Sequence, residues 1–225
     1  MVRTPLVLIA FLVLAVPAWA AEPIGMENVV PEARDRDVPR ARWEYTADGA
    51  LWTRVALAAV QGHGAALIET VPKDIADWCP AYPENPPKAR AAFWVGLLST
   101  VSRYESTWKP RAVGGGNQWF GLMQIYPPTA EFRDCRVQTG RGLLNGADNL
   151  SCAVRIMAIT VPRDQAISLK DTRWRGVAAD WGPVRTDWMR RDMQNYTKRQ
   201  SYCRPLSEVR PKERPVGYAG PDSEF

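Results

Sequence analysis

The sequence predicts a mainly α-helical protein, because apolar residues recur at helical spacing in several segments and long alternating strand patterns are absent. The chain has 225 residues, of which 46% are hydrophobic and 24% are charged, as is typical of a globular protein and not of a disordered one. This length accommodates one domain with tails, or at most two small domains. We therefore expect a globular, helical fold with a core of its own.

Helical patterns occur in five segments that prolines and glycines separate. From Leu51 an apolar run with a glycine break predicts one or two short helices, and prolines between residues 80 and 87 then interrupt the chain. Ala91–Trp108 carries a strong helical pattern that Pro110 should end, since proline disfavours helix in the residue before it. Further helices are predicted for Asn149–Ile159, capped by Asp148 or Asn149, for the series Trp174, Val177, Ala178 and Trp181, and for about Thr186–Gln200.

The first twenty residues have the pattern of a secretory signal peptide. Arg3 supplies the positive start, Leu6–Val16 is an unbroken apolar run, and Ala18-Trp19-Ala20 fits the rule for cleavage after Ala20. The run is shorter than the roughly 20 residues that span a bilayer, and no later segment approaches that length. We expect a periplasmic or secreted protein with no stable membrane insertion.

Composition divides the remaining chain into three parts. Residues 21–42 are charged and contain proline without a sustained apolar period, which predicts a flexible leader. Residues 43–203 should form the folded domain. Residues 204–225 are rich in proline and charge, and we expect a flexible tail.

The four cysteines are most simply explained as two disulfides in an exported protein. Three pairings are possible. We favour Cys135 with Cys152, which closes a short loop, and Cys79 with Cys203, which joins the start of the domain to its end.

The histidine content and the charge exclude several classes of function. His63 is the single histidine, which excludes most catalytic zinc sites because these need two or three histidine ligands. No Gly-x-Ser-x-Gly motif indicates a serine hydrolase. We expect no metal and no cofactor. The net charge of +5 becomes +4 without the signal peptide, and the charges alternate in sign, so we expect no nucleic-acid binding.

One carboxylate, that of Glu105, lies on an apolar helical face. The series Trp94, Leu98, Val101 and Glu105 steps by 4, 3 and 4 residues, which places the four side chains on one face. Partial burial disfavours the ionised form and raises the pKa, as a general acid near neutral pH requires. The alternative is a glutamate that reaches solvent in the last helical turn.

Two motifs extend this interpretation. Glu105-Ser106-x-Trp108-x-Pro110, followed by the segment Gly-Leu-Met-Gln-Ile at 121–125, resembles the lysozyme-like domain of soluble lytic transglycosylases, which cleave the glycan strands of bacterial peptidoglycan. The resemblance covers about residues 88–185, and the helical stretch before it is an addition. It implies cleavage of the β-1,4 bond between MurNAc and GlcNAc with a 1,6-anhydro product, and Glu105 acting as acid and then base.

The resemblance also implies a set of residues that contact or support the bound glycan. These are Gln124, which would hydrogen-bond sugar, Met123 beside it, Gly121 of the same motif, Ser106, and Asn149, which matches a helix-start asparagine facing the cleft.

Trp119 and Trp181 are candidates for stacking on sugar, because pyranose rings present apolar faces to aromatic side chains. A place in the core is the alternative for both.

Residues 179–183 depart from the family pattern Ala-Tyr-Asn-Ala-Gly. Asp180 stands where the tyrosine near the glutamate is expected, and Tyr126 or Tyr196 are possible substitutes. If Asp180 is a second carboxylate that positions water, the protein is a lysozyme-type hydrolase; it can also be a surface residue. The missing tyrosine and the bulky Trp119-Phe120 pair leave an inactive glycan-binding or assembly protein as a further alternative. Peptidoglycan is the expected partner, and no cell-envelope machinery is identified.

Overall fold

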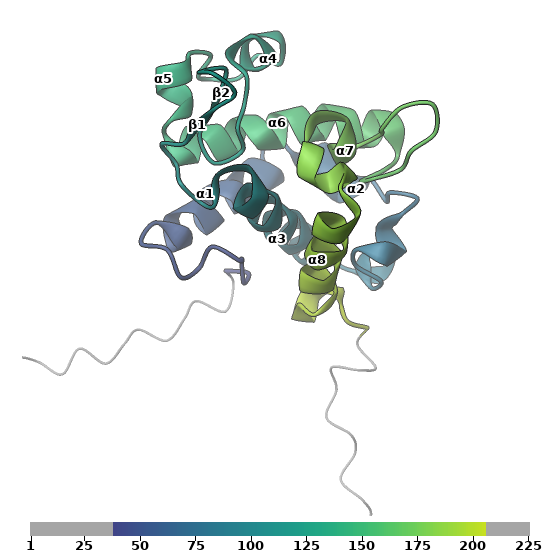
Figure 1. Ribbon diagram of the computed structural model, residues 1–225. Helices are drawn as coiled ribbons and strands as arrows, with labels where there is room; N and C mark the ends of the chain where they lie inside the picture. The colour runs from purple at the N-terminus through teal and green to yellow at the C-terminus, as the bar shows by residue number, and fades with distance from the viewer. Residues whose placement is uncertain (1–37, 206–225) are drawn as a thin grey trace, which may run out of the picture. The chain divides into compact units, whose positions relative to one another are not determined.

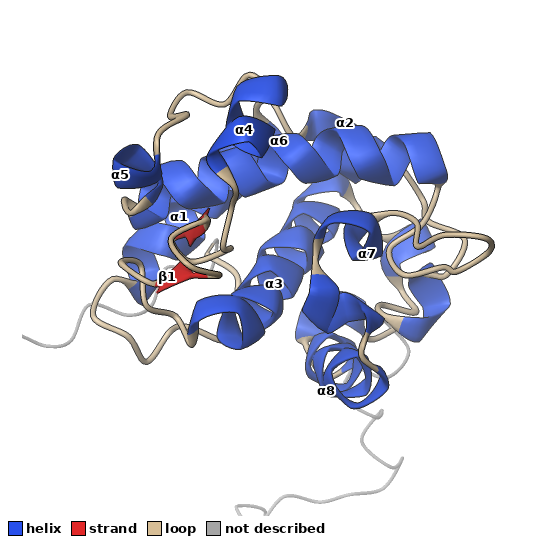
Figure 2. Ribbon diagram, turned by 45° about the horizontal axis from the view of Figure 1, so that its top comes forward, coloured by secondary structure: helices blue, strands red, loops and turns tan. Residues whose placement is uncertain are grey.

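The computed structural model describes residues 38–205, so the predicted signal peptide, residues 21–37 of the predicted leader and residues 206–225 of the predicted tail lie outside it. In the described part helices predominate, and the strands form one short antiparallel hairpin (Figure 2). The elements are α1 (Gly49–Gln61), α2 (Ala65–Glu69), η1 (Ile75–Asp77), η2 (Tyr82–Glu84), α3 (Pro87–Ser106), β1 (Val113–Gly114), β2 (Trp119–Phe120), α4 (Pro127–Phe132), α5 (Gly140–Leu143), α6 (Gly146–Asp164), α7 (Val177–Asp180), η3 (Gly182–Arg185), α8 (Asp187–Lys198) and η4 (Ser201–Cys203).

Helix α3 forms the centre of the core. Every residue from Ala91 to Ser102 is buried, because α1, α2 and α8 all pack against this helix (Figure 1). Helix α6 in turn packs on α1 and α2. A helix that is covered on every side belongs to the core, so its position is fixed along most of its length.

The ends of α3 differ from the prediction. The helix begins at Pro87, four residues earlier than expected, because proline is tolerated at the first helical position, where its missing N–H needs no partner. It ends at Ser106, since Thr107 and Trp108 adopt left-handed backbone angles, with φ of 55° and 58°. The helix therefore ends two residues before the predicted end at Trp108, and the left-handed residues, not Pro110, end it.

Helix α6 also starts earlier than predicted. The side chain of Asn145 caps it by accepting hydrogen bonds from the backbone N–H groups of Ala147 and Asp148. The cap is therefore neither Asp148 nor Asn149, which lie inside the first turn. The apolar periodicity begins only at Leu150, and for this reason the sequence pattern missed the first turn.

The predicted helix through Trp174, Val177, Ala178 and Trp181 does not form as one unit. Only Val177–Asp180 is helical, and Trp174 instead pairs with Lys170 in an isolated β-bridge. Gly176 between them has φ of 63°, and a Cβ there would overlap the Ala166 carbonyl. By contrast, the two short helices after residue 48 and the last helix, α8, confirm the prediction.

Ala41 and Arg42, at the end of the predicted leader, pack against the helices of the domain. Ala41 is buried, and the backbone N–H of Arg42 donates to Ser99 Oγ of α3 at 2.8 Å. The Arg42 guanidinium pairs with Asp192 of α8, which also accepts a hydrogen bond from Tyr104 at 2.7 Å. The end of the leader thus joins α3 to α8.

The cysteines pair as the sequence analysis favoured. Cys79 bonds to Cys203, and Cys135 bonds to Cys152. The first disulfide ties the segment before η2 to η4, and the second ties the segment after α4 to α6.

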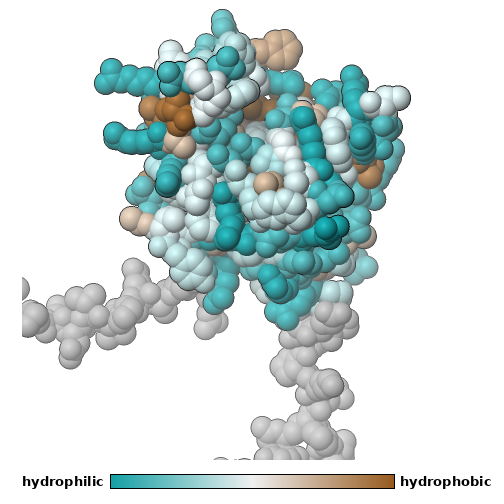
Figure 3. All heavy atoms as spheres, viewed as in Figure 1, coloured by the Kyte–Doolittle hydropathy of each residue, from teal (hydrophilic) through white to brown (hydrophobic). Residues whose placement is uncertain are grey.

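The surface seen in Figure 3 is largely hydrophilic, and its apolar residues lie in small, separate patches. Among residues 38–205, no helix is both long enough and apolar enough to cross a membrane.

The two disulfides should contribute unequally to stability. In the chain-entropy model, the loop of 124 residues closed by Cys79–Cys203 is worth about 5 kcal/mol, and the loop of 17 residues closed by Cys135–Cys152 about 3 kcal/mol. We expect Cys79→Ala/Cys203→Ala to lower the free energy of unfolding more than Cys135→Ala/Cys152→Ala, as measured by urea denaturation. The reverse order would show that native-state packing, and not loop closure, controls the contribution of these bonds.

Candidate active site

Glu105 lies in the last turn of α3, at the point where the buried helix reaches the surface. Trp94, Leu98 and Val101, the apolar residues of the predicted face, are fully buried, and Glu105 follows them along this face where burial becomes partial. The left-handed residues that end α3 turn the chain away immediately afterwards. The glutamate side chain is thereby directed into a cleft.

The carboxylate of Glu105 is partly desolvated and has no partner. No hydrogen bond or ion pair joins it to another residue of the described range 38–205. Burial raises the pKa of Glu105 to about 7, and the positive charge of Arg185 opposes this rise. Near neutral pH the side chain is therefore present in both protonation states, as a residue that gives and takes a proton needs.

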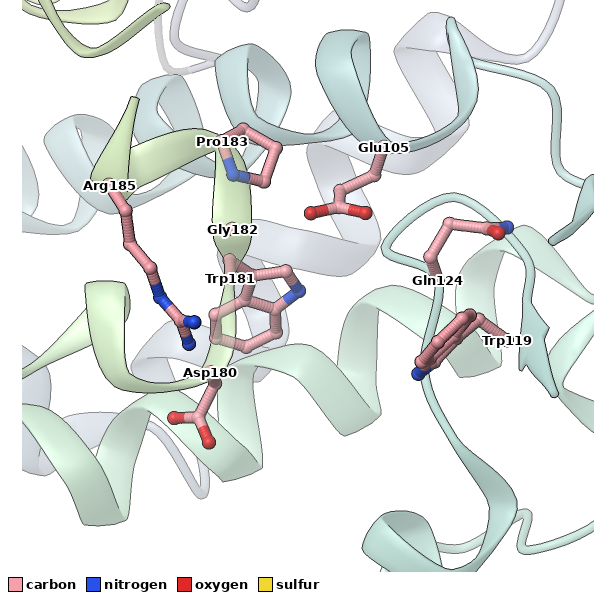
Figure 4. Close-up of a pocket in the computed structure, with 8 residues that line it drawn as sticks. All are labelled: Glu105, Trp119, Gln124, Asp180, Trp181, Gly182, Pro183 and Arg185. Atoms are coloured by element: carbon pink, nitrogen blue, oxygen red, sulfur yellow. The ribbon is translucent and has the colours of Figure 1, made fainter. Parts of the chain in front are cut away.

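The cleft around Glu105 has a volume of about 350 Å³ and is open to solvent. Figure 4 shows that the Glu105 carboxylate points toward the segment 181–183, while Trp119 and Gln124 lie on the opposite side. Three segments that are separate in the sequence therefore meet here: the end of α3, residues 119–124 and residues 180–185. The lining residues are Glu105, Trp119, Gln124, Asp180, Trp181, Gly182, Pro183 and Arg185.

Gln124 is placed by a tight turn at the end of the hairpin. The turn runs between Phe120 and Ile125, which form a backbone bridge, and Gln124 itself has φ of 46°. Its side-chain nitrogen donates to the carbonyl oxygens of Ala112 at 3.2 Å and Gly121 at 2.8 Å. These bonds hold the amide at the edge of the cleft, in keeping with the predicted position.

Met123 and Asn149 do not line the cleft, contrary to the prediction. Both side chains are fully buried. Asn149 accepts a hydrogen bond from the Met123 N–H at 2.8 Å and donates to the carbonyls of Phe120 and Leu143 at 2.9 and 3.0 Å. Asn149 thus satisfies buried backbone groups of the motif loop in addition to the Phe120–Ile125 bridge. The sequence could not distinguish this role from a role in the cleft.

Gly121 and Ser106 are likewise part of the support and do not line the cleft. Gly121 has φ of 79°, and a Cβ there would overlap the Leu143 carbonyl and the Asn149 amide. The Ser106 hydroxyl donates to the Ser102 carbonyl within α3 at 3.2 Å. The predicted contribution of Ser106 to active-site hydrogen bonds is not found.

The two tryptophans differ in exposure. Trp119 is 43% exposed and lies against the backbone of Gly115 at the hairpin turn. Trp181 is only 4% exposed, and its Nε1–H donates to the Met123 carbonyl at 3.0 Å. Trp119 therefore offers a ring face to the cleft, while Trp181 mainly joins the two sides of the cleft from behind.

Asp180 reaches solvent at the rim, and its carboxylate points away from Glu105, with Trp181 between them (Figure 4). Desolvation by the surrounding protein raises the pKa of Asp180, while the Thr160 hydroxyl and the charges of Arg133, Arg163 and Arg185 lower it.

Neither tyrosine proposed as a substitute lines the Glu105 cleft. Tyr126 lies in an adjoining hollow of about 90 Å³, which also contains Ile125, Thr129 and Ile156 and shares Trp119 with the cleft. Tyr196 lies on α8, where the Arg42 guanidinium stacks over its ring.

Arg185 is the site residue that sequence reasoning missed. Its Nε and Nη2 atoms donate to the carbonyls of Ala178 at 2.6 Å and Ala179 at 2.7 Å. The residue belongs to the short η3 segment, whose sequence has no periodicity that indicates a site. Gly182 and Pro183 precede it and were noted only as part of a family pattern.

The described residues contain no group of three histidine, cysteine, aspartate or glutamate side chains suited to hold a metal ion.

Comparison with known proteins agrees with this geometry. Residues 85–179 match the family model of the transglycosylase SLT domain, so the chain carries this domain as its motifs predicted. The mainly helical, lysozyme-like fold is thereby confirmed. The matched range includes Glu105 and Gln124 and ends just before Asp180.

Solved structures of one protein have a similar fold. "Bd0314 DslA wild-type form 2" is 25% identical, with a TM-score of 0.68 over 76% of this chain and 100% of that chain. Two glutamate-to-glutamine mutants of the same protein are 26% and 24% identical, both with a TM-score of 0.68. They cover 76% and 74% of this chain, and 100% and 99% of their own. No curated protein matches the chain.

The raised pKa of Glu105 has a consequence for stability. The folded state holds this proton up to about pH 7, whereas the unfolded chain releases it near the ordinary glutamate pKa of 4.5. Ionisation of Glu105 therefore destabilises the fold as pH rises through this window. We expect Glu105→Gln to raise the free energy of unfolding at pH 8 by at most about 3 kcal/mol, with little change at pH 4. Urea denaturation at both pH values measures this. Glu131→Gln, on an exposed part of α4, controls for the loss of one charge, and an equal effect of Glu105→Gln at both pH values would contradict the assignment.

The position of the Trp119 ring should depend on Gly115. This glycine has φ of 53°, and a Cβ there would overlap the Trp119 ring, whereas a Cβ at Gly116, with φ of 63°, meets no atom within 4 Å. Both alanine variants therefore carry a backbone cost of about 1 kcal/mol, but Gly115→Ala should also displace the ring. We expect Gly115→Ala alone to weaken the binding of a chitin tetrasaccharide, measured by calorimetry. Equal affinities of the two variants would show that Gly115 does not place the ring.

Proposed function

We propose that this protein is a lytic transglycosylase of bacterial peptidoglycan, which cleaves the β-1,4 bond between MurNAc and GlcNAc and leaves a 1,6-anhydro end. Glu105 acts as the acid and then as the base. The observation that carries the proposal is the Glu105 carboxylate, which is partly buried, has no partner among the described residues and faces a cleft with a pKa of about 7. The SLT domain supports the same class of substrate.

In the first step, protonated Glu105 donates its proton to the glycosidic oxygen. The bond between C1 of MurNAc and this oxygen breaks, and GlcNAc leaves with a free 4-hydroxyl group. Positive charge develops at C1 of MurNAc, and the new carboxylate of Glu105 lies within reach to stabilise it. The charge of Arg185 favours the ionised form of Glu105 at this point.

In the second step, the Glu105 carboxylate takes the proton from the 6-hydroxyl of the same MurNAc while O6 bonds to C1. This closes the anhydro ring and returns Glu105 to its protonated form without consuming water. The attacking hydroxyl belongs to the substrate, so it gains from proximity. Desolvation of Glu105 favours the return of the proton.

The position of Asp180 favours this route over hydrolysis. A second carboxylate that activates water has to face the reacting carbon together with the acid. The Asp180 side chain points away from Glu105 and lies beyond Trp181 (Figure 4). One carboxylate and a hydroxyl of the substrate therefore account for the chemistry best.

Trp119 and Gln124 are the proposed sugar contacts. Both line the side of the cleft opposite the segment 181–183, and the Trp119 ring is partly exposed (Figure 4). An aromatic face suits the apolar face of a pyranose ring, and an amide suits its hydroxyl or acetamido groups.

We also propose that the protein is exported and works in the periplasm or outside the cell, with cleavage after Ala20 and a folded domain that extends to Cys203. The two disulfides support an oxidising compartment.

Digestion of purified peptidoglycan tests the proposal. We expect muropeptides with 1,6-anhydro ends by mass spectrometry, and a rate loss of roughly 100-fold to 10,000-fold for Glu105→Gln, because the proton donor is removed. Glu131→Gln should keep the full rate.

Other product patterns would contradict the proposal. Ordinary reducing ends, together with loss of activity in Asp180→Asn, would establish a lysozyme-type hydrolase. Binding of glycan strands without any product would identify an inactive glycan-binding protein.

A further inference from the structure

Arg185 places a positive charge in the cleft that no carboxylate neutralises. Its side chain lines the same cavity as Glu105, and within residues 38–205 it forms no salt bridge. Two of its nitrogens are fixed by the backbone carbonyls of Ala178 and Ala179. Nη1 makes no hydrogen bond to any described residue, so it remains free to donate. The guanidinium is therefore both held in place and available.

The other charges on this side of the cleft do not cancel Arg185. Asp180 lines the cavity as well, but the charges of Arg133 and Arg163 act on it in addition to that of Arg185. Arg163 is itself paired with Asp164 on the far side. Glu105 is largely uncharged when it is ready to donate its proton. Because the charge of Arg133 offsets that of Asp180, the charge of Arg185 remains available to a ligand on this side of the cleft.

A fixed arginine of this kind is suited to a carboxylate. Guanidinium groups bind carboxylates through charge-assisted hydrogen bonds, and preorganisation reduces the entropy that such a bond costs. In the proposed substrate, MurNAc carries a lactyl group, which is a carboxylate when it is free and which otherwise bears a peptide with carboxylates of its own. GlcNAc carries no acidic group.

We propose that Arg185 forms a carboxylate-binding subsite of the cleft, which recognises the acidic substituent of MurNAc and so selects peptidoglycan over neutral glycans such as chitin. The proposal rests on the proposed function. The carboxylate comes either from a free lactyl group or from a stem peptide, and the experiment separates these two sources.

The test measures binding in the Glu105→Gln protein, which does not turn over its ligands. Three tetrasaccharides serve as probes in calorimetry: neutral chitin tetrasaccharide, an alternating GlcNAc–MurNAc tetrasaccharide with free lactyl groups, and the same tetrasaccharide bearing stem peptides. Adding Arg185→Gln should lower the affinity for at least one acidic ligand by about 10-fold to 100-fold and leave the affinity for the neutral ligand unchanged. The acidic ligand with the larger loss identifies the source of the carboxylate.

Two further variants control for charge and for geometry. Arg136→Gln removes an equal charge from a side chain that is 80% exposed, and it should not alter any of the three affinities. Arg185→Lys keeps the charge but cannot hold both carbonyls while it binds a carboxylate. It should therefore give a smaller loss than Arg185→Gln, again for the acidic ligands only.

Three results would overturn the proposal. Equal losses for all three ligands would mean that Arg185 only supports the backbone of residues 178 and 179, and no loss for any ligand would mean that it binds nothing. If Arg185→Gln does not fold, the salt dependence of binding to the Glu105→Gln protein decides the question. The affinity for an acidic ligand should fall as salt concentration rises, while the affinity for chitin should not. The same salt dependence for both ligands would overturn the subsite. Failure of the Glu105→Gln protein to bind any of the three ligands would instead refute the proposed function itself.

Discussion

The desolvation of one carboxylate governs the organisation of this protein. Glu105 lies in the last turn of α3, whose middle is covered by α1, α2 and α8. Its side chain therefore leaves the core at the end of this helix and lines a cleft there. Burial raises its pKa to about 7, and no hydrogen bond or ion pair from a described residue offsets this rise. A partner that stabilised the carboxylate would strengthen the fold and remove the acid. Desolvation of Glu105 therefore both lowers the stability of the fold when the carboxyl group ionises and makes this group an acid near neutral pH.

The remaining cleft is held by bonds from side chains to loop carbonyls. Asn149 supports the motif loop, Trp181 reaches the Met123 carbonyl, and Arg185 holds the end of α7. Loops lack the repeating bonds of helices and sheets, so buried loop carbonyls need side-chain donors. Asn149 supports the motif loop from behind the cleft, whereas Trp181 and Arg185 hold loop carbonyls and also line the cavity. These contacts explain why several residues of the motifs are buried behind the cleft.

The two sides of the cleft differ in character. Trp119 and Gln124, from the hairpin and its turn, present an aromatic ring and an amide, whereas the segment from Asp180 to Arg185 presents charged groups. An aromatic and amide wall suits any N-acetylated sugar, because these groups contact features common to all such rings. The charged wall can distinguish among glycans. This division follows from the fold, since the walls come from parts of the chain about sixty residues apart.

The sequence by itself determined the helical class, the main helices, the place of Glu105 on an apolar helical face and the SLT resemblance. These features depend on local periodicity and on short motifs. It also favoured the disulfide pairing that the structure contains.

Only the tertiary structure decided which motif residues face the cleft. Met123 and Asn149 turned out to be buried, and Arg185, which no local pattern marks, lines the cavity. Burial of a side chain depends on elements distant in sequence: Asn149 reaches residues 26 and 29 positions away, and Trp181 reaches one 58 positions away. Such contacts exist only after the chain has folded.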